Sequence, residues 1–74
     1  MKLPQISGRD TIKKLNKIGF VATRQKGSHV RIEKQTPEGI IKITIPLHPQ
    51  LKKGTLLHII KDAGLTLEEF LKLE

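Results

Sequence analysis

The sequence predicts a small α+β domain in which helices cover one face of a three-stranded antiparallel sheet. Three observations support this fold class. Apolar residues recur at helical spacing before Gly19, alternate after it, and return to helical spacing from Thr55. Strong turn signals divide the alternating region into three short segments. Finally, a chain of 74 residues suffices for one domain, expected over residues 1–74, with a compact core because it buries only about 60% of its unfolded surface.

The first helix is expected to begin after Ser7 and to end at Gly19. Ser7 is a good N-cap, and Asp10 occupies the capping-box position as a shorter substitute for Glu. Gly19 stands where a glycine often ends a helix, so these limits predict a helix of about eleven residues. The apolar face is formed by Ile12, Leu15 and Ile18, and the opposite, solvated face carries Lys13, Lys14 and Lys17.

The first two strands are predicted on either side of a tight turn. Residues 20–25 form the first strand, with Phe20 and Ala22 on one side. Lys26-Gly27 supplies the turn, since glycine readily adopts positive φ. In the second strand Val30 and Ile32 point one way, whereas His29, Arg31 and Glu33 point the other.

The rest of the chain predicts one more strand and two more helices. After the turn Thr36-Pro37-Glu38-Gly39, the third strand has inward Ile41, Ile43 and Ile45, outward Lys42 and Thr44, and ends at Pro46. Residues 47–54 form a loop, and Thr55 caps a helix that ends at Gly64. The buried stripe of that helix is Leu56, Leu57, Ile59, Ile60 and Ala63. Thr66-Leu67-Glu68-Glu69 is a capping box, which begins a short helix with Leu67, Phe70 and Leu71 on one face.

The charge of the chain is concentrated in its N-terminal half. The whole sequence has 14 Lys and Arg against 7 Asp and Glu, a net charge of +7. Residues 1–34 hold nine of the cations and two of the acids, whereas residues 35–74 hold five of each. This asymmetry favours a surface that faces a polyanion, above all a phosphate backbone, although a basic surface can also serve solubility alone. With two Phe and no Tyr or Trp, RNA would be bound through charge and shape rather than base stacking.

Composition excludes several classes of protein. The absence of cysteine rules out a disulfide scaffold, a thiolate metal site and a cysteine nucleophile. No apolar run approaches the roughly 20 residues that a bilayer requires, so no membrane association is expected. The N-terminus lacks the apolar region of a secretory signal, and a cytoplasmic protein is therefore expected.

The order of elements and the basic N-terminal half suggest a layout like that of the double-stranded-RNA-binding domain. Distinctive segments then follow in order along the chain: Lys2-Leu3-Pro4, Ser7-Gly8-Arg9-Asp10, Gly19-Phe20, Arg24-Gln25-Lys26-Gly27-Ser28-His29, Ile45-Pro46-Leu47-His48, Lys53-Gly54-Thr55-Leu56, Ala63-Gly64-Leu65 and Glu69-Phe70. Over nearly the whole chain these segments closely resemble the HicA (YcfA-like) toxin family. The resemblance implies an mRNA interferase of a type II toxin–antitoxin system that acts independently of the ribosome, with a HicB-type antitoxin as partner. It also implies that His29, in the Gly-Ser-His motif, is the catalytic residue.

The chemistry expected at His29 can be stated from the residues around it. In RNA the 2′-hydroxyl attacks the neighbouring phosphorus once a base removes its proton, and an imidazole that titrates near neutral pH suits this work. Cations and backbone N–H groups stabilise the negative charge of the transition state. The residues expected to bind RNA are Arg24, Lys26, Gly27, Ser28 and Arg31. Alternation puts Arg31 on the face of His29, but the sequence does not settle which face Arg24 and Lys26 share. The scheme requires no metal or other cofactor.

Other interpretations stay open from the residues alone. His29 is a solvated side chain beside a hairpin turn if the resemblance is set aside, and the group that protonates the leaving oxygen is undetermined. His48 is expected to hydrogen-bond its loop, His58 to lie at the core edge or surface, and a zinc site formed from the three histidines is disfavoured by their spacing. Two other functions fit the same charge pattern: a non-catalytic RNA-binding module, and an interaction domain that docks an acidic protein.

Overall fold

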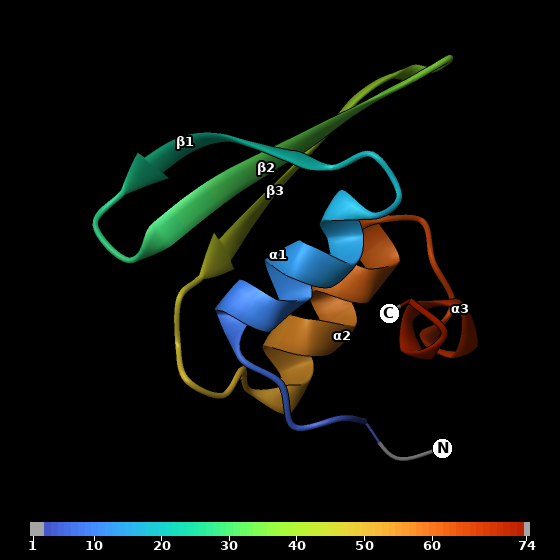
Figure 1. Cartoon of the computed structure of the whole chain (residues 1–74). Helices are drawn as coiled ribbons and strands as arrows, with labels where there is room; N and C mark the ends of the chain where they lie inside the picture. The colour runs from blue at the N-terminus through green and yellow to red at the C-terminus, as the bar shows by residue number, and fades with distance from the viewer. Residues whose placement is uncertain (1–2, 74) are drawn as a thin grey trace.

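Three antiparallel strands form a sheet, and the helices all lie on one side of it (Figure 1). This computed structural model describes residues 3–73; Lys2, which belongs to the basic segment and to the family resemblance, lies outside them. The elements are α1 (Gly8–Asn16), β1 (Val21–Lys26), β2 (His29–Thr36), β3 (Gly39–Pro46), α2 (Lys53–Asp62) and α3 (Leu67–Leu71). This order confirms the predicted α+β fold.

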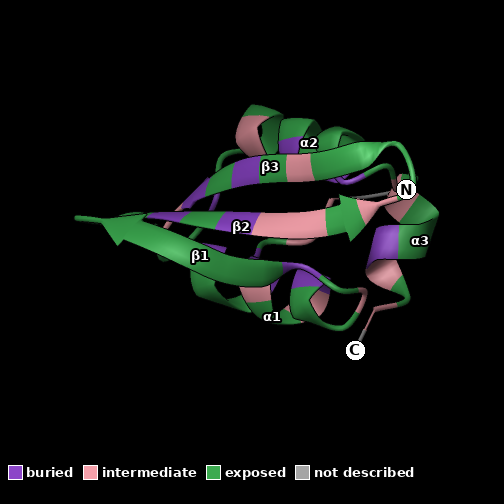
Figure 2. Ribbon diagram, turned by 90° about the horizontal axis from the view of Figure 1, so that it is seen from above, coloured by how far each residue is buried: buried purple, intermediate pink, exposed green. Residues whose placement is uncertain are grey.

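The two ladders of the sheet differ in regularity. β2 is the central strand, and β1 and β3 are its two edges. Pairing of β2 with β3 is continuous from the pair His29–Pro46 to the pair Thr36–Gly39. Pairing of β1 with β2 shifts register between Ala22 and Arg24. Figure 2 looks onto the face of the sheet away from the helices, here called the outer face, and shows that β1 is exposed along its whole length.

The first strand therefore departs from its prediction. Phe20 is fully buried but precedes the strand, which begins one residue later than predicted, at Val21, and Ala22 is exposed. Ala22 pairs with the buried Ile32, so it faces the helix side of the sheet. It stays exposed because β1 is an edge strand with no neighbour on its far side.

The core lies between the inner face of the sheet and the helices. It consists of Val30, Ile32, Ile43 and Ile45 from the strands, Leu15, Leu56, Ile59, Ile60, Ala63 and Phe70 from the helices and their ends, and Ile6, Phe20 and Leu51 from the connections. The one buried polar side chain of the described residues, Thr11, donates its hydroxyl to the Ser7 carbonyl at 2.8 Å. Burial of these aliphatic and aromatic side chains supplies the main favourable contribution to folding.

Helix α1 begins as predicted but ends earlier. The Ser7 side chain accepts a hydrogen bond from the Asp10 backbone N–H at 3.0 Å, which satisfies one of the free donors at the helix start. The last helical residue is Asn16, and residues 17–19 form a turn in which Gly19 has a φ of 101°. This turn directs Phe20 into the core, a path that a longer helix would prevent.

The start of α1 packs directly on the end of β3. A Cβ atom at Gly8 would lie 1.9 Å from the Pro46 carbonyl oxygen, a distance at which the backbones would have to separate. The Gly8 N–H donates to the His48 carbonyl at 3.0 Å, and the Leu51 N–H donates to the Ile6 carbonyl at 2.8 Å. Glycine is therefore required at position 8 by close backbone approach.

Helix α2 differs from its prediction at two positions. It begins at Lys53 after Lys52, without a side-chain cap, rather than after Thr55. Buried Leu51, two residues before this start, is held by the hydrogen bond from its N–H to the Ile6 carbonyl. Leu57 is 44% exposed, because the buried positions of α2 follow three- and four-residue spacing and Leu57 lies beyond that stripe. None of the helices within residues 3–73 is long and apolar enough to cross a membrane.

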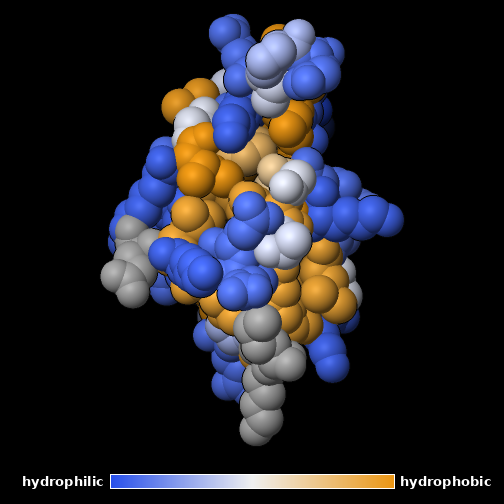
Figure 3. Space-filling view, turned by 90° about the vertical axis from the view of Figure 1, so that its right-hand side faces the viewer, coloured by the Kyte–Doolittle hydropathy of each residue, from blue (hydrophilic) through white to orange (hydrophobic). Residues whose placement is uncertain are grey.

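Helix α3 has the predicted capping box and is tied to α1. The Glu69 N–H donates to the Thr66 hydroxyl at 3.1 Å, and the Thr66 N–H donates to the Glu69 carboxylate at 2.8 Å. The bond from the Thr66 N–H to the carboxylate, together with the Thr66 hydroxyl, favours the ionised form and holds the pKa of Glu69 below its ordinary value. Lys14 is half-buried rather than solvated as predicted, since its Nζ donates to the Leu73 carbonyl and lies 5.5 Å from the centre of the Phe70 ring. Figure 3 faces this end of the molecule and shows apolar side chains between hydrophilic ones.

Candidate functional site

His29 begins β2 immediately after a two-residue hairpin turn. The turn residues are Gly27, with a φ of 60°, and Ser28; a positive φ at the first position alone is the pattern of a type II′ turn. The turn thus falls one residue later than predicted, because Lys26 is the last residue of β1 and pairs with His29. Paired residues have Cβ atoms about 5 Å apart, so the side chains of Lys26 and His29 are neighbours.

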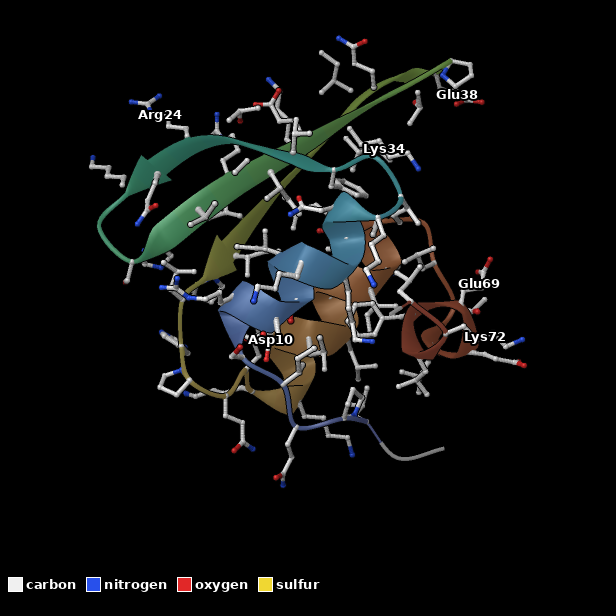
Figure 4. All side chains as sticks on the ribbon, viewed as in Figure 1. Asp10, Arg24, Lys34, Glu38, Glu69 and Lys72 are labelled. Atoms are coloured by element: carbon white, nitrogen blue, oxygen red, sulfur yellow. The ribbon has the colours of Figure 1, made fainter. Side chains whose placement is uncertain are left out.

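The register of the hairpin brings the cations of β1 to the face of His29. Lys26 pairs with His29, and regular pairing from there places Arg24 opposite Arg31. The next residue away from the turn, Thr23, has no partner in β2 and forms a bulge. The bulge changes the facing only of the residues before it, because strict alternation from Arg24 would otherwise turn Ala22 to the outer face. The register therefore answers the question that the sequence left open: both side chains share the outer face with His29 and Arg31. Figure 4 shows Arg24 rising from β1 on the side away from the helices.

The outer face is hollowed at its turn end. The hollow has a volume of about 660 Å³ and is lined by Arg24, Lys26, Gly27, Ser28, His29, Arg31 and Thr44. The structure thus brings together every residue predicted to bind or cleave RNA. Sequence reasoning missed Thr44, although its outward place in the alternation of β3, opposite Arg31, was the signal that could have assigned it.

The cations of the hollow are exposed and have no acidic partner among the described residues. The ion pairs of residues 3–73 are His58–Asp62 and Lys72–Glu68, both on helices. The acidic residue of the outer face, Glu33, instead accepts a hydrogen bond from the Thr23 hydroxyl at 2.9 Å. Positive charge that is concentrated in a concave surface and not neutralised by the protein attracts anions.

The last residue of β3 and the residues just after it hold the turn and the start of β2 in place. The Leu47 N–H donates to the Ser28 carbonyl at 2.7 Å, and Pro46 pairs with His29. The same segment is held to the start of α1 by the bond between Gly8 and His48. The position of His29 is therefore fixed by the hairpin, by β3 and by α1.

The other two histidines lie outside this hollow. His48 is exposed, and its backbone carbonyl, rather than its imidazole, makes the bond that holds the loop. His58 lies at the surface of α2, with Nε2 3.1 Å from Oδ2 of Asp62. Nowhere in residues 3–73 do three or more His, Asp or Glu side chains gather closely enough to hold a metal ion.

Comparison with known protein families matches residues 8–65 to the family described as the HicA toxin of bacterial toxin–antitoxin systems. The matched segment runs from the first residue of α1 to the residue after the turn that ends α2, so it includes the whole sheet and the hollow. Comparison with curated individual proteins gives no match.

Proposed function

The chain belongs to the HicA toxin family, and on this premise we propose that it is an endoribonuclease that cleaves RNA with His29 as its acid–base residue. Family membership gives the protein a toxin role in a toxin–antitoxin system and implies a cognate antitoxin. The observation that carries the proposed activity is the place of His29: an exposed imidazole in a basic hollow, directly opposite Lys26.

The proposed reaction uses the RNA's own nucleophile. His29 removes the proton of a 2′-hydroxyl, the 2′-oxygen forms a bond to the adjacent phosphorus, and the bond from phosphorus to the 5′-oxygen breaks. The products are a 2′,3′-cyclic phosphate and a 5′-hydroxyl that has taken up a proton. Negative charge develops on the phosphoryl oxygens, where Lys26 and the backbone N–H groups of the turn can stabilise it. No redox partner or metal enters this scheme.

The substitution His29→Ala tests the assignment. Its cleavage rate should fall by about a hundredfold or more, because general acid–base catalysis contributes at least that much. Stability should change by no more than about 0.5 kcal/mol, since the side chain is exposed, and RNA affinity should be nearly unchanged. A melting curve, a binding titration and a cleavage time course on one preparation separate these effects.

His58→Ala is the matched control, because it removes another exposed imidazole outside the hollow; it should keep the parental rate. If His29→Ala cleaves as fast as the parent, the catalytic assignment is wrong. If neither protein cleaves any defined RNA but both bind it, the chain is a non-catalytic RNA-binding module.

The proposed partner is a HicB-type antitoxin that covers the outer face around His29. Its support is electrostatic: the cations of the hollow lack acidic partners within residues 3–73, so an acidic protein surface can complement them. Cleavage by the purified toxin–antitoxin complex at the rate of the free toxin would contradict masking of the site.

A further inference from the structure

Arg24 and Arg31 form an unusual pair on the outer face. They are directly opposed across the β1–β2 ladder, both are exposed, and neither forms an ion pair with a described acidic residue. Like charges that face each other across a sheet are destabilising. The two-residue turn sets this opposition, because pairing is regular from Lys26–His29 to Arg24–Arg31, so the fold contains a feature that favours anion binding at a cost in stability.

The Arg24–Arg31 pair is next to the proposed cleavage position on the outer face. Lys26 pairs with His29, and the next outward pair along the same ladder is Arg24 with Arg31. Two residues of a strand span roughly 7 Å, which is close to the separation of successive phosphates along an extended RNA strand. Two consecutive phosphates can therefore occupy the two pairs without stretching the RNA.

The Lys26–His29 and Arg24–Arg31 pairs form a row of basic side chains on the outer face, here called the basic track. Glu33 lies at the end of this track that is farther from the turn. It is the next outward residue of β2 after Arg31, and its carboxylate is held by the Thr23 hydroxyl at 2.9 Å. A third phosphate at this position would meet a fixed negative charge, because the hydrogen bond keeps the carboxylate on the bulge. The favourable track thus comprises two phosphate positions.

We propose, building on the ribonuclease function above, that Arg24 and Arg31 together hold a single phosphate of single-stranded RNA, the one adjacent to the phosphate cleaved at His29. This phosphate subsite fixes the strand along the ladder and places the scissile phosphate beside Lys26. Glu33 and Thr23 end the track, so the outer face binds two consecutive phosphates and no longer run of backbone.

The salt dependence of binding tests how many phosphates the two arginines hold. The probe is a 2′-O-methyl oligonucleotide of defined sequence, which lacks the nucleophile and cannot be cleaved. On single strands the slope of log affinity against log salt is about 0.7 per neutralised phosphate. The double variant Arg24→Gln/Arg31→Gln should therefore lower the slope by about 0.7 and the affinity by about tenfold or more. A fall in slope of about 1.4 would mean that each arginine holds its own phosphate, and it would overturn the shared subsite.

Lys61→Gln is the charge-matched control. Lys61 is exposed on α2, in the layer behind the sheet, and its loss should leave the slope unchanged. A double arginine variant with the parental slope would also overturn the proposal. So would a variant that keeps RNA affinity but no longer binds the antitoxin, because the pair would then serve the partner protein.

If the proposed ribonuclease function is wrong, the cleavage assay and the salt dependence of binding give a different combination of results. If the parent does not cleave unmodified RNA but the double variant lowers the slope by about 0.7, the phosphate subsite holds and only the catalytic assignment fails. If the parent cleaves normally and the slope does not change, the catalytic assignment holds and the subsite is wrong.

Discussion

The inner face of the sheet supports the fold, whereas the outer face carries the candidate functional site. On the inner face, Val30, Ile32 and Ile45 are almost fully buried and pack against the helices. On the outer face, the alternate residues of the same strands are exposed, and those at the turn end are mostly cationic or polar. Stability therefore determines which side chains the inner face accepts, whereas the outer face could carry almost any polar residue. Opposed arginines on a face where stability does not require them point to a ligand.

The outer face itself is divided along its length. The turn end carries the basic hollow with His29, while the other end carries Val21 and Ile40, which are 58% and 54% exposed, beside Glu33. The proposed RNA substrate would therefore bind the first region rather than the second. The boundary between them is the Thr23 bulge, where the regular pairing that opposes the two arginines ends and the Thr23 hydroxyl holds Glu33.

The largest effect that separates the two faces is expected from Ile32→Ala. Ile32 is fully buried, and truncation of such a residue lowers the free energy of unfolding by about 2–5 kcal/mol, through lost burial and a cavity. The same substitution on the outer face, Ile40→Ala, should change it by about 0.5 kcal/mol or less. Urea denaturation of both variants measures the difference; equal losses would show that the outer face also contributes to the core.

The next effect tests the link between the core and the hollow. Gly8→Ala places a Cβ atom against the Pro46 carbonyl, and such overpacking costs about 1–3 kcal/mol of stability. Because Pro46 pairs with His29, the displacement should also slow RNA cleavage. Gly54→Ala is the control: a Cβ there meets no atom within 4 Å, and alanine in a helix should leave stability unchanged or raise it by up to about 1 kcal/mol. A Gly8→Ala protein with parental melting temperature and rate would disprove this link.

Periodicity was sufficient to predict the inner face. In β2 and β3 the alternation of Ile and Val with polar residues identified the buried side chains, and the helical spacing of Leu56, Ile59 and Ile60 identified the buried stripe of α2. Turn chemistry located both hairpins to within a residue. The prediction was wrong where tertiary packing decides, as at Leu57 and at the start of α2, which follows buried Leu51 rather than a capping side chain.

The outer face could be predicted only in part. The place of His29 and Arg31 followed from alternation within one strand, whereas the catalytic role of His29 is a proposal that rests on family resemblance. The shared face of Arg24 and Lys26 was not settled by the sequence, because it depends on the number of residues in the hairpin turn, which sets the pairing register. A pairing register has no hydrophobic pattern of its own, because it is a property of two strands together. The same holds for the bulge at Thr23.

The smallest expected change in the free energy of unfolding is also the one that most sharply distinguishes the two faces. Arg31→Gln removes the like-charge opposition with Arg24, so we expect the free energy of unfolding to rise by about 0.2–1 kcal/mol at low salt. RNA affinity should fall in the same protein, because the phosphate subsite loses half of its charge. Lys42→Gln neutralises another cation of the outer face, but Lys42 is opposed to Glu33. That control should lower stability slightly or leave it unchanged, and the difference between the two variants should shrink as salt screens exposed charges. Urea midpoints at low and high salt measure both effects. A loss of stability in Arg31→Gln at low salt would mean that its side chain supports the sheet, and the outer face would then be less independent of the fold than we infer.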